Sequence, residues 1–132
     1  MPEAHGKVFP FDGPERIDSS LLDTFPYEYP DREIELVVET DEFTCVCPFS
    51  GLPDFARIRV VYVPDKLCLE LRSYKYYLLT YRNVGIYHEH VINHILEDLV
   101  ARVKPKRMKV IGDYEIRGGI HTVGSVEYVK ND

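Results

Sequence analysis

HEHVINHILEDLVARVKP, residues 88–105, is the stretch that decides the fold. It carries an apolar stripe at helical spacing, made of Ile92, Leu96, Leu99 and Val103. Pro105 cannot continue a helix, so the helix is expected to end just before it. His88 falls in line with the stripe and should therefore point toward the layer that the helix covers.

The segments on either side of this helix read mainly as strands. Residues 33–40 (EIELVVET), 56–64 (ARIRVVYVP) and 67–71 alternate in the way that half-buried strands do. Residues 73–82 (SYKYYLLTYR) begin with a possible N-cap, Ser73, and predict a short helix. Residues 108–119 and 121–129 predict two strands joined around Arg117-Gly118-Gly119, where a Gly-Gly pair suits a tight hairpin turn.

The order of these elements predicts the fold class. Strand, strand, helix, helix, strand, strand is typical of an α+β fold in which two helices cover one face of an antiparallel sheet. Such a sheet leaves two edges, and pairing between subunits is one way to satisfy them. Residues 1–30 hold many prolines and little periodicity, so we expect an irregular N-terminal arm followed by one domain over residues 31–132.

Composition narrows the class of protein. The net charge of −6 argues against a general nucleic-acid binder, which would usually be basic. No apolar run approaches the roughly 20 residues that span a bilayer, and residues 1–16 lack the apolar core of a signal peptide. We therefore expect a cytoplasmic protein without a membrane partner. The chain's 3 cysteines, an odd number, do not make a disulfide framework and should be thiols.

The segment TCVCPFSGLPDFA, residues 44–56, reads as a loop between strands and holds the first candidate for chemistry. Cys47 precedes one proline and Asp54 follows another, so a folded-back loop would bring a nucleophilic thiol beside a proton acceptor. The residues alone favour the plainer interpretation, a buried small side chain at Cys47 and a turn former at Asp54. Cys45 and Cys68 read as packing residues.

The histidines do not form a known metal motif. The residue four positions after His88 is Ile92, so the His-Glu-x-x-His pattern of zinc proteases fails. His90 and His94 share a helix face, which fits either a solvated surface or a metal pair. His88 suits either a satisfied core histidine or a proton-transfer group. Glu89 lies in the first turn and could accept two N–H bonds from a purine-like edge.

Cations cluster around the predicted short helix. Arg72 and Lys75, together with Arg117, would make a local phosphate site, and a solvated charged face is the alternative. The chain has no Gly-x-Gly-x-x-Gly and no P-loop, so a nucleotide would not bind in a Rossmann or Walker manner.

Six short motifs occur in a fixed order along the chain. They are Glu42-Phe43-Thr44; Cys47-Pro48 with Gly51 and Pro53-Asp54-Phe55-Ala56; Glu70-x-Arg72-Ser73-x-Lys75-x-Tyr77; Tyr81-Arg82-Asn83; His88-Glu89; and Arg117-Gly118-Gly119-Ile120. With them, residues 25–128 resemble the QueF-type 7-cyano-7-deazaguanine reductases, the nitrile reductases of queuosine biosynthesis. Arg72 stands where the family usually has lysine, and Val91 stands where some members have a cysteine.

The resemblance implies a fold, an assembly and an activity. The fold is the tunnelling fold, whose subunits join edge to edge in rings, typically as a decamer of two stacked pentamers with active sites between subunits. The activity is a nitrile oxidoreductase that uses NADPH as its cofactor. The substrate is the small molecule 7-cyano-7-deazaguanine (preQ0), which is reduced to the aminomethyl compound (preQ1) through a covalent thioimide, and no nucleic acid or metal is bound.

The resemblance also implies roles for individual residues. It makes Cys47, Asp54 and His88 catalytic. It assigns substrate binding to Leu69, Glu70, Leu71, His88 and Glu89, and it assigns cofactor binding to Arg72, Ser73, Lys75 and Arg117. The alternatives are an amidinotransferase of the same superfamily that acts on tRNA, a zinc enzyme of the GTP cyclohydrolase type, and a ring-forming module without an active site.

Overall fold

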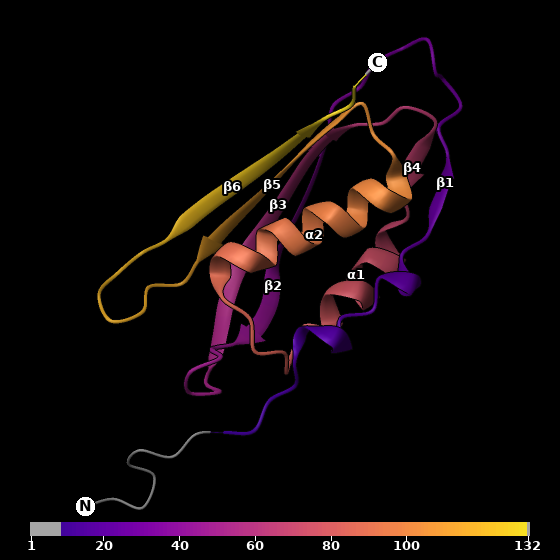
Figure 1. Cartoon of the computed structure of the whole chain (residues 1–132). Coiled ribbons are helices and arrows are strands. Elements are labelled where there is room, and N and C mark those ends of the chain that lie inside the picture. Colours follow the sequence, from indigo (N-terminus) through magenta and orange to yellow (C-terminus); the bar gives the residue numbers. More distant parts are fainter. Residues whose placement is uncertain (1–8, 132) are drawn as a thin grey trace, which may run out of the picture.

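A four-stranded antiparallel sheet forms one layer of the structure, and two helices cover one of its faces (Figure 1). The computed structural model describes residues 9–131. Its helices are η1 (Pro14–Arg16), η2 (Ser19–Leu21), α1 (Leu71–Leu79) and α2 (His88–Val103). Its strands are β1 (Thr24–Pro26), β2 (Leu36–Val46), β3 (Pro53–Val63), β4 (Leu67–Leu69), β5 (Arg107–Tyr114) and β6 (Val123–Val129). The α+β class and the order of the main elements are confirmed.

The main sheet has the order β2-β3-β5-β6, and the core lies between it and the helices. Ile58, Val60 and Tyr62 of β3 point to the helices and are buried, because alternate residues of a strand face opposite sides. The predicted stripe of α2 packs on this face and is joined by Val91 and Ile95, which are fully buried. Each such large side chain contributes about 1.5–3 kcal/mol when it leaves water.

Gly112 of β5 lets α2 lie close to the sheet. A Cβ atom at this position would stand 2.8 Å from Cγ2 of Ile92, which is closer than real contacts allow. The first turns of α2 therefore sit directly on the end of β5, and this approach brings the side chain of His88 onto that of Tyr114.

The expected loop over residues 44–56 is mostly strand. β2 continues to Val46 and β3 begins at Pro53, so the turn is confined to residues 47–52 and Asp54 pairs with Cys45 in the ladder. Proline and glycine suggested a long loop, but a proline at the first residue of a strand costs no ladder bond. The correction places Asp54 on a rigid strand.

The start of α1 also differs from its prediction. The helix begins at Leu71, and its N-cap is Glu70, whose carboxylate accepts hydrogen bonds of 2.8 Å from the N–H groups of Arg72 and Ser73. Ser73 is buried inside the first turn, where its hydroxyl donates to the Glu70 carbonyl at 2.7 Å. A carboxylate three residues upstream therefore takes the capping role expected of Ser73.

The N-terminal arm is more regular than its prolines suggested. It contains η1, η2 and β1, and β1 pairs with β4 in a second, two-stranded sheet. The part of the predicted arm before Phe9 lies outside the described residues. At the other end of the chain, the hairpin turn at Arg117 is confirmed, since Gly118 and Gly119 have φ angles of 58° and 78°. No helix among residues 9–131 is both long enough and apolar enough to cross a bilayer.

Candidate active site

A cavity of about 220 Å³ opens where the turn after β2, the start of β3 and the start of α2 meet. It is lined by Cys47, Pro48, Asp54, Ile86, Tyr87, His88, Glu89 and Arg117. The three residues expected to be catalytic therefore line one cavity, although they come from three separate segments. The cavity is open to solvent on one side, as a substrate site requires.

The turn over residues 47–52 holds the Cys47 sulfur at the rim of this cavity. The N–H of Cys47 donates to the Leu52 carbonyl at 2.8 Å, and the N–H of Gly51 donates to the Cys47 carbonyl at 2.7 Å. Gly51 has a φ of 73°, and a Cβ there would lie 2.2 Å from the carbonyl oxygen of Phe9. Only glycine combines this left-handed backbone with such a close approach.

The same turn activates the thiol. Partial burial acts to raise the pKa of Cys47, but hydrogen bonds from the backbone N–H groups of Phe49 and Ser50, with one from the Ser50 hydroxyl, outweigh it and lower that pKa. These donors stabilise the thiolate, which is the nucleophilic form. Cys45, two residues earlier and inside β2, is fully buried, and burial raises its pKa to about 12.

Asp54 is the buried carboxylate of the site, with 6% of its surface exposed. One carboxylate oxygen, Oδ1, pairs with the Arg117 guanidinium, which also donates to the Pro53 carbonyl at 2.8 Å. The other oxygen, Oδ2, lies 3.2 Å from Nε2 of His88. The two partners offset the cost of burying the charge of Asp54 and fix the orientation of its carboxylate.

His88 is fixed from two sides. Its ring lies flat on the ring of Tyr114, with 3.6 Å between centroids and 8° between planes, and the Tyr114 hydroxyl donates to the His88 carbonyl at 3.3 Å. The chain before it is tied to β2, where the Val46 N–H donates to Val84 at 3.0 Å and the Ile86 N–H donates to Val46 at 3.2 Å. The histidine is thus held beside Asp54.

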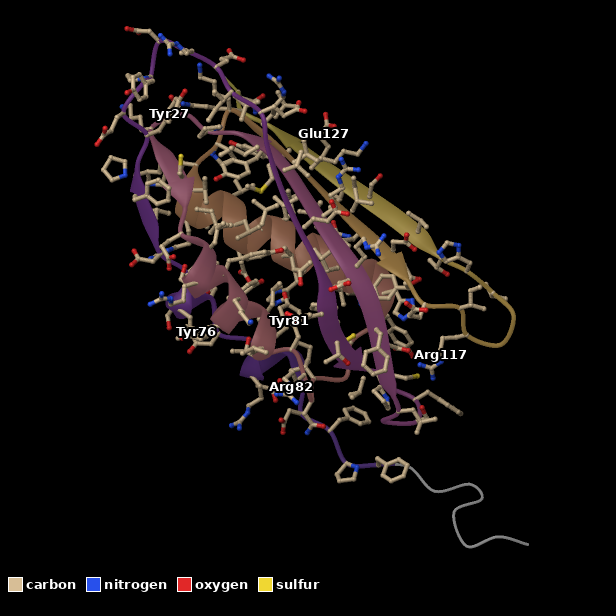
Figure 2. The ribbon with its side chains drawn as sticks, turned by 180° about the vertical axis from the view of Figure 1, so that it is seen from behind. Tyr27, Tyr76, Tyr81, Arg82, Arg117 and Glu127 are labelled. Carbon is tan, nitrogen blue, oxygen red and sulfur yellow. The ribbon has the colours of Figure 1, made fainter. Side chains whose placement is uncertain are left out.

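A second set of expected site residues lies elsewhere on the chain. Leu69 is buried in β4, while Arg72 and Lys75 are exposed on α1. Lys75 borders a groove of about 220 Å³ between β2 and α1 and lies 3.9 Å from the carboxylate of Glu42. Figure 2 shows Arg117 and the α1 residue Tyr76 on opposite sides of the molecule.

Two expectations about this second set need correction. Arg117 does not join Arg72 and Lys75 in one basic site within the chain, because the hairpin turn places it on Asp54. The Ser73 hydroxyl is engaged inside the protein, where it also accepts from the Asp23 N–H at 2.9 Å, so its surroundings are those of a buried structural residue.

The helix face of His90 and His94 is not uniformly solvated. His90 is exposed, but Nδ1 of His94 lies 3.0 Å from the carboxylate of Asp98 and 3.3 Å from the hydroxyl of Tyr81. Within residues 9–131, no group of three or more His, Cys, Asp or Glu side chains is placed to hold a metal ion.

Sequence reasoning missed Tyr114 as the ring beneath His88. Both this stacking and the Arg117–Asp54 pair depend on the pairing of β3 with β5. The ion pair also depends on the turn between β5 and β6, which carries Arg117 back to the start of β3. Spacing along the chain carries no signal for contacts of this kind.

Comparison with known proteins places the chain in a family. A family model described as QueF-like protein matches residues 53–132. A protein of Chloroherpeton thalassium named NADPH-dependent 7-cyano-7-deazaguanine reductase is 52% identical over 108 residues, covering 82% of this chain and 93% of the relative. A relative of the same name from Thermomicrobium roseum is 53% identical over 112 residues, covering 85% and 88%. The crystal structure of the archaeosine synthase QueF-Like in the apo form matches with a TM-score of 0.65 and 25% identity, over 76% of this chain and 96% of that one. The chain belongs to the QueF-like family.

Proposed function

We propose that this protein is an NADPH-dependent reductase that converts the nitrile of 7-cyano-7-deazaguanine to an aminomethyl group, a step of queuosine biosynthesis. The observation that carries the proposal is the shared cavity of Cys47, Asp54 and His88, in which the pKa of the thiol is lowered. The names of relatives that are about half identical over most of the chain support it. We also propose a cytoplasmic location. The three cysteines are free thiols, as expected in a reducing compartment.

The first step is covalent. A nitrile carbon is a weak electrophile, so attack requires a thiolate, which the donors of the 47–52 turn stabilise at Cys47. The Cys47 sulfur forms a bond to the nitrile carbon while one C–N π bond breaks. Asp54 takes the thiol proton and delivers it to the nitrogen, which gives a thioimide with a C=N bond that can accept hydride.

The remaining steps need two hydrides and one more proton. NADPH supplies the hydrides, one from each of two cofactor molecules. After the first hydride reaches the thioimide carbon, the C–S bond breaks, Cys47 leaves as a thiolate and an imine remains. The second hydride reduces the imine carbon as the nitrogen takes a proton through Asp54 and His88, so the nitrile consumes two hydrides and two protons in all.

The chain also offers groups that would hold the two reactants. Glu89 lies exposed at the rim of the cavity, where its carboxylate would accept N–H bonds from the deazaguanine edge. Arg72 and Lys75, on the exposed face of α1, would bind cofactor phosphates, although Arg72 replaces the usual lysine. Because the second set lies apart from Cys47, we propose that Leu69, Glu70 and Leu71 complete the site of a neighbouring subunit within a ring.

One observation favours a second candidate. The solved structure reported above is an archaeosine synthase, so an amidinotransferase acting on tRNA shares this fold. Such an enzyme would use the cysteine and aspartate without consuming NADPH. The acidic net charge of −6 favours the reductase, because a tRNA substrate would want a basic surface, and so do Ser73, Lys75 and Tyr77, which keep the reductase motif.

A direct assay tests the proposal. The purified protein with free 7-cyano-7-deazaguanine should oxidise two equivalents of NADPH per equivalent of product, which the loss of NADPH absorbance measures. Intact mass without NADPH should show one substrate adduct, which Cys47→Ala abolishes. No NADPH oxidation, together with ammonia-dependent change of tRNA, would move the chain to the amidinotransferase class.

A further inference from the structure

Four polar side chains meet between α1 and α2, away from the catalytic cavity. Tyr77 lies on α1 and Tyr81 lies two residues beyond its end, and both are fully buried. His94 and Asp98 come from one face of α2 and are half-buried. Figure 2 labels Tyr81 among the side chains in front of α2.

The contacts of these groups are short and shared. The Tyr77 hydroxyl donates to Oδ2 of Asp98 at 2.6 Å and lies 2.8 Å from the Tyr81 hydroxyl. Nδ1 of His94 lies 3.0 Å from the same carboxylate oxygen. A single assignment satisfies all groups: Tyr77 and His94 each donate to Asp98, and Tyr81 donates to Tyr77.

This cluster spans the boundary between two helices with different tasks. α1 carries Lys75 on its exposed face, and α2 carries His88 at its first residue. Tyr81 also packs edge-on against Phe43 of β2, with 5.2 Å between ring centroids. A buried hydrogen bond to a carboxylate fixes direction as well as distance, so the Tyr77–Asp98 bond constrains how α1 is rotated against α2.

We propose that the Tyr77 hydroxyl and the Asp98 carboxylate form an interhelical clamp that positions the cofactor-binding face of α1, with His94 orienting Asp98. The inference rests on the proposed function and deepens it. Tyr77 belongs to the same short motif as Arg72 and Lys75, yet its side chain points inward to α2. It is therefore a positioning residue and does not itself touch the cofactor.

The chain offers a matched control on the same helix. The hydroxyl of Tyr74 is buried too, but within residues 9–131 it has no hydrogen-bond partner. Tyr77→Phe and Tyr74→Phe each remove one buried hydroxyl from α1, and only the first removes a bond to α2. Comparing the two variants isolates the clamp from the general effect of losing a tyrosine hydroxyl.

The expected result is a change confined to the cofactor. Relative to Tyr74→Phe, Tyr77→Phe should raise the KM for NADPH by about three- to tenfold, the fold-change that corresponds to one typical protein hydrogen bond. At saturating 7-cyano-7-deazaguanine, the rate of adduct formation at Cys47, measured by intact mass without NADPH, should be unchanged, because Cys47, Asp54 and His88 keep their positions.

Two further variants keep the inference falsifiable if Tyr77→Phe folds poorly. Asp98→Ala removes the shared acceptor from the α2 side and should raise the KM for NADPH without slowing adduct formation. The double variant with Tyr77→Phe should be little worse than Asp98→Ala alone, because both changes break the same bond. Equal NADPH KM values for Tyr77→Phe and Tyr74→Phe, an unchanged NADPH KM in Asp98→Ala, or additive effects in the double variant would each overturn the clamp. If the unaltered protein does not oxidise NADPH, the proposed function itself fails, which is a separate outcome.

Discussion

Cys45 and Cys47 are two residues apart, and their thiols have pKa values shifted in opposite directions. Cys45 lies inside the β2–β3 ladder, where burial first, and then the charges of Asp54 and Cys47, raise its pKa to about 12. Cys47 lies just past the end of the strand, in the turn whose N–H groups lower its pKa. The end of β2 at Val46 therefore separates a buried packing residue from the proposed nucleophile.

This difference predicts selective alkylation. A thiol with a lowered pKa is ionised over a wider pH range, so iodoacetamide should modify Cys47 at pH values where Cys45 and Cys68 stay unmodified. The rate should rise with pH to a midpoint below that of an ordinary thiol, as measured by peptide mass mapping. Ser50→Ala, which removes one donor to the sulfur, should move the midpoint upward. Equal labelling of all three cysteines in the folded protein would contradict this.

Arg117 has two candidate roles: its contacts suggest that it orients Asp54, whereas the family motif suggests that it binds a cofactor phosphate. Its pairing with Asp54 predicts that Arg117→Ala lowers kcat, by about 10–100-fold, with little change in the KM for NADPH, because the buried carboxylate loses its orienting partner. A phosphate-binding role predicts the reverse, a raised KM at nearly constant kcat. Steady-state kinetics with NADPH as the varied substrate separate the two, and Arg72→Ala provides the comparison.

At the scale of elements, the stability of α1 depends on its N-cap, Glu70. Glu70→Ala leaves the N–H groups of Arg72 and Ser73 without their side-chain acceptor, so we expect the free energy of unfolding to fall by about 1 kcal/mol. Urea unfolding followed by circular dichroism measures the change. Glu70→Ser, which keeps a capping oxygen, should recover most of it.

The same pair of variants separates stability from substrate binding. If Glu70 also contacts the substrate in a neighbouring subunit, Glu70→Ser should restore stability but leave the KM for 7-cyano-7-deazaguanine raised. Full recovery of both would assign Glu70 to the cap alone, and an unchanged unfolding midpoint in Glu70→Ala would contradict the capping role.

Periodicity predicted the elements well where the apolar pattern was long. The stripe of α2 and the alternation of β3 needed no long-range information, since one buried face determines each pattern. The ends were less predictable: Ser73 looked like a cap, and the prolines near Asp54 looked like a loop. Cys47, Asp54 and His88 were found through motifs, whereas the contacts of Arg117 and Tyr114 depend on strand register and cannot be derived from spacing.

On the scale of the whole molecule, the chain presents two separate parts of a site and two outer strands. β2 and β6 are the terminal strands of the main sheet, so each has a backbone edge that no strand of the described chain covers. The proposed catalytic set surrounds Cys47, and the proposed binding set on β4 and α1 lies across the molecule, as the positions of Arg117 and Tyr76 show (Figure 2). A ring joined edge to edge would cover both edges and bring one set of each subunit to the other set of its neighbour.

Subunit complementation tests this arrangement. Cys47→Ala destroys one set, and the double variant Arg72→Ala/Lys75→Ala destroys the other, so each protein alone should be inactive at low NADPH. If every site takes one set from each of two neighbours, co-refolding the two in equal amounts leaves about a quarter of the sites with both sets intact. NADPH oxidation should therefore recover to roughly that fraction of the unaltered protein's rate.

Mixing Cys47→Ala with Asp54→Ala is the control, because both changes fall in the same set and every mixed site then lacks one catalytic group. Recovery in the first mixture and none in the second would place the reaction between subunits, whereas no recovery in either would mean that a single chain closes its own site.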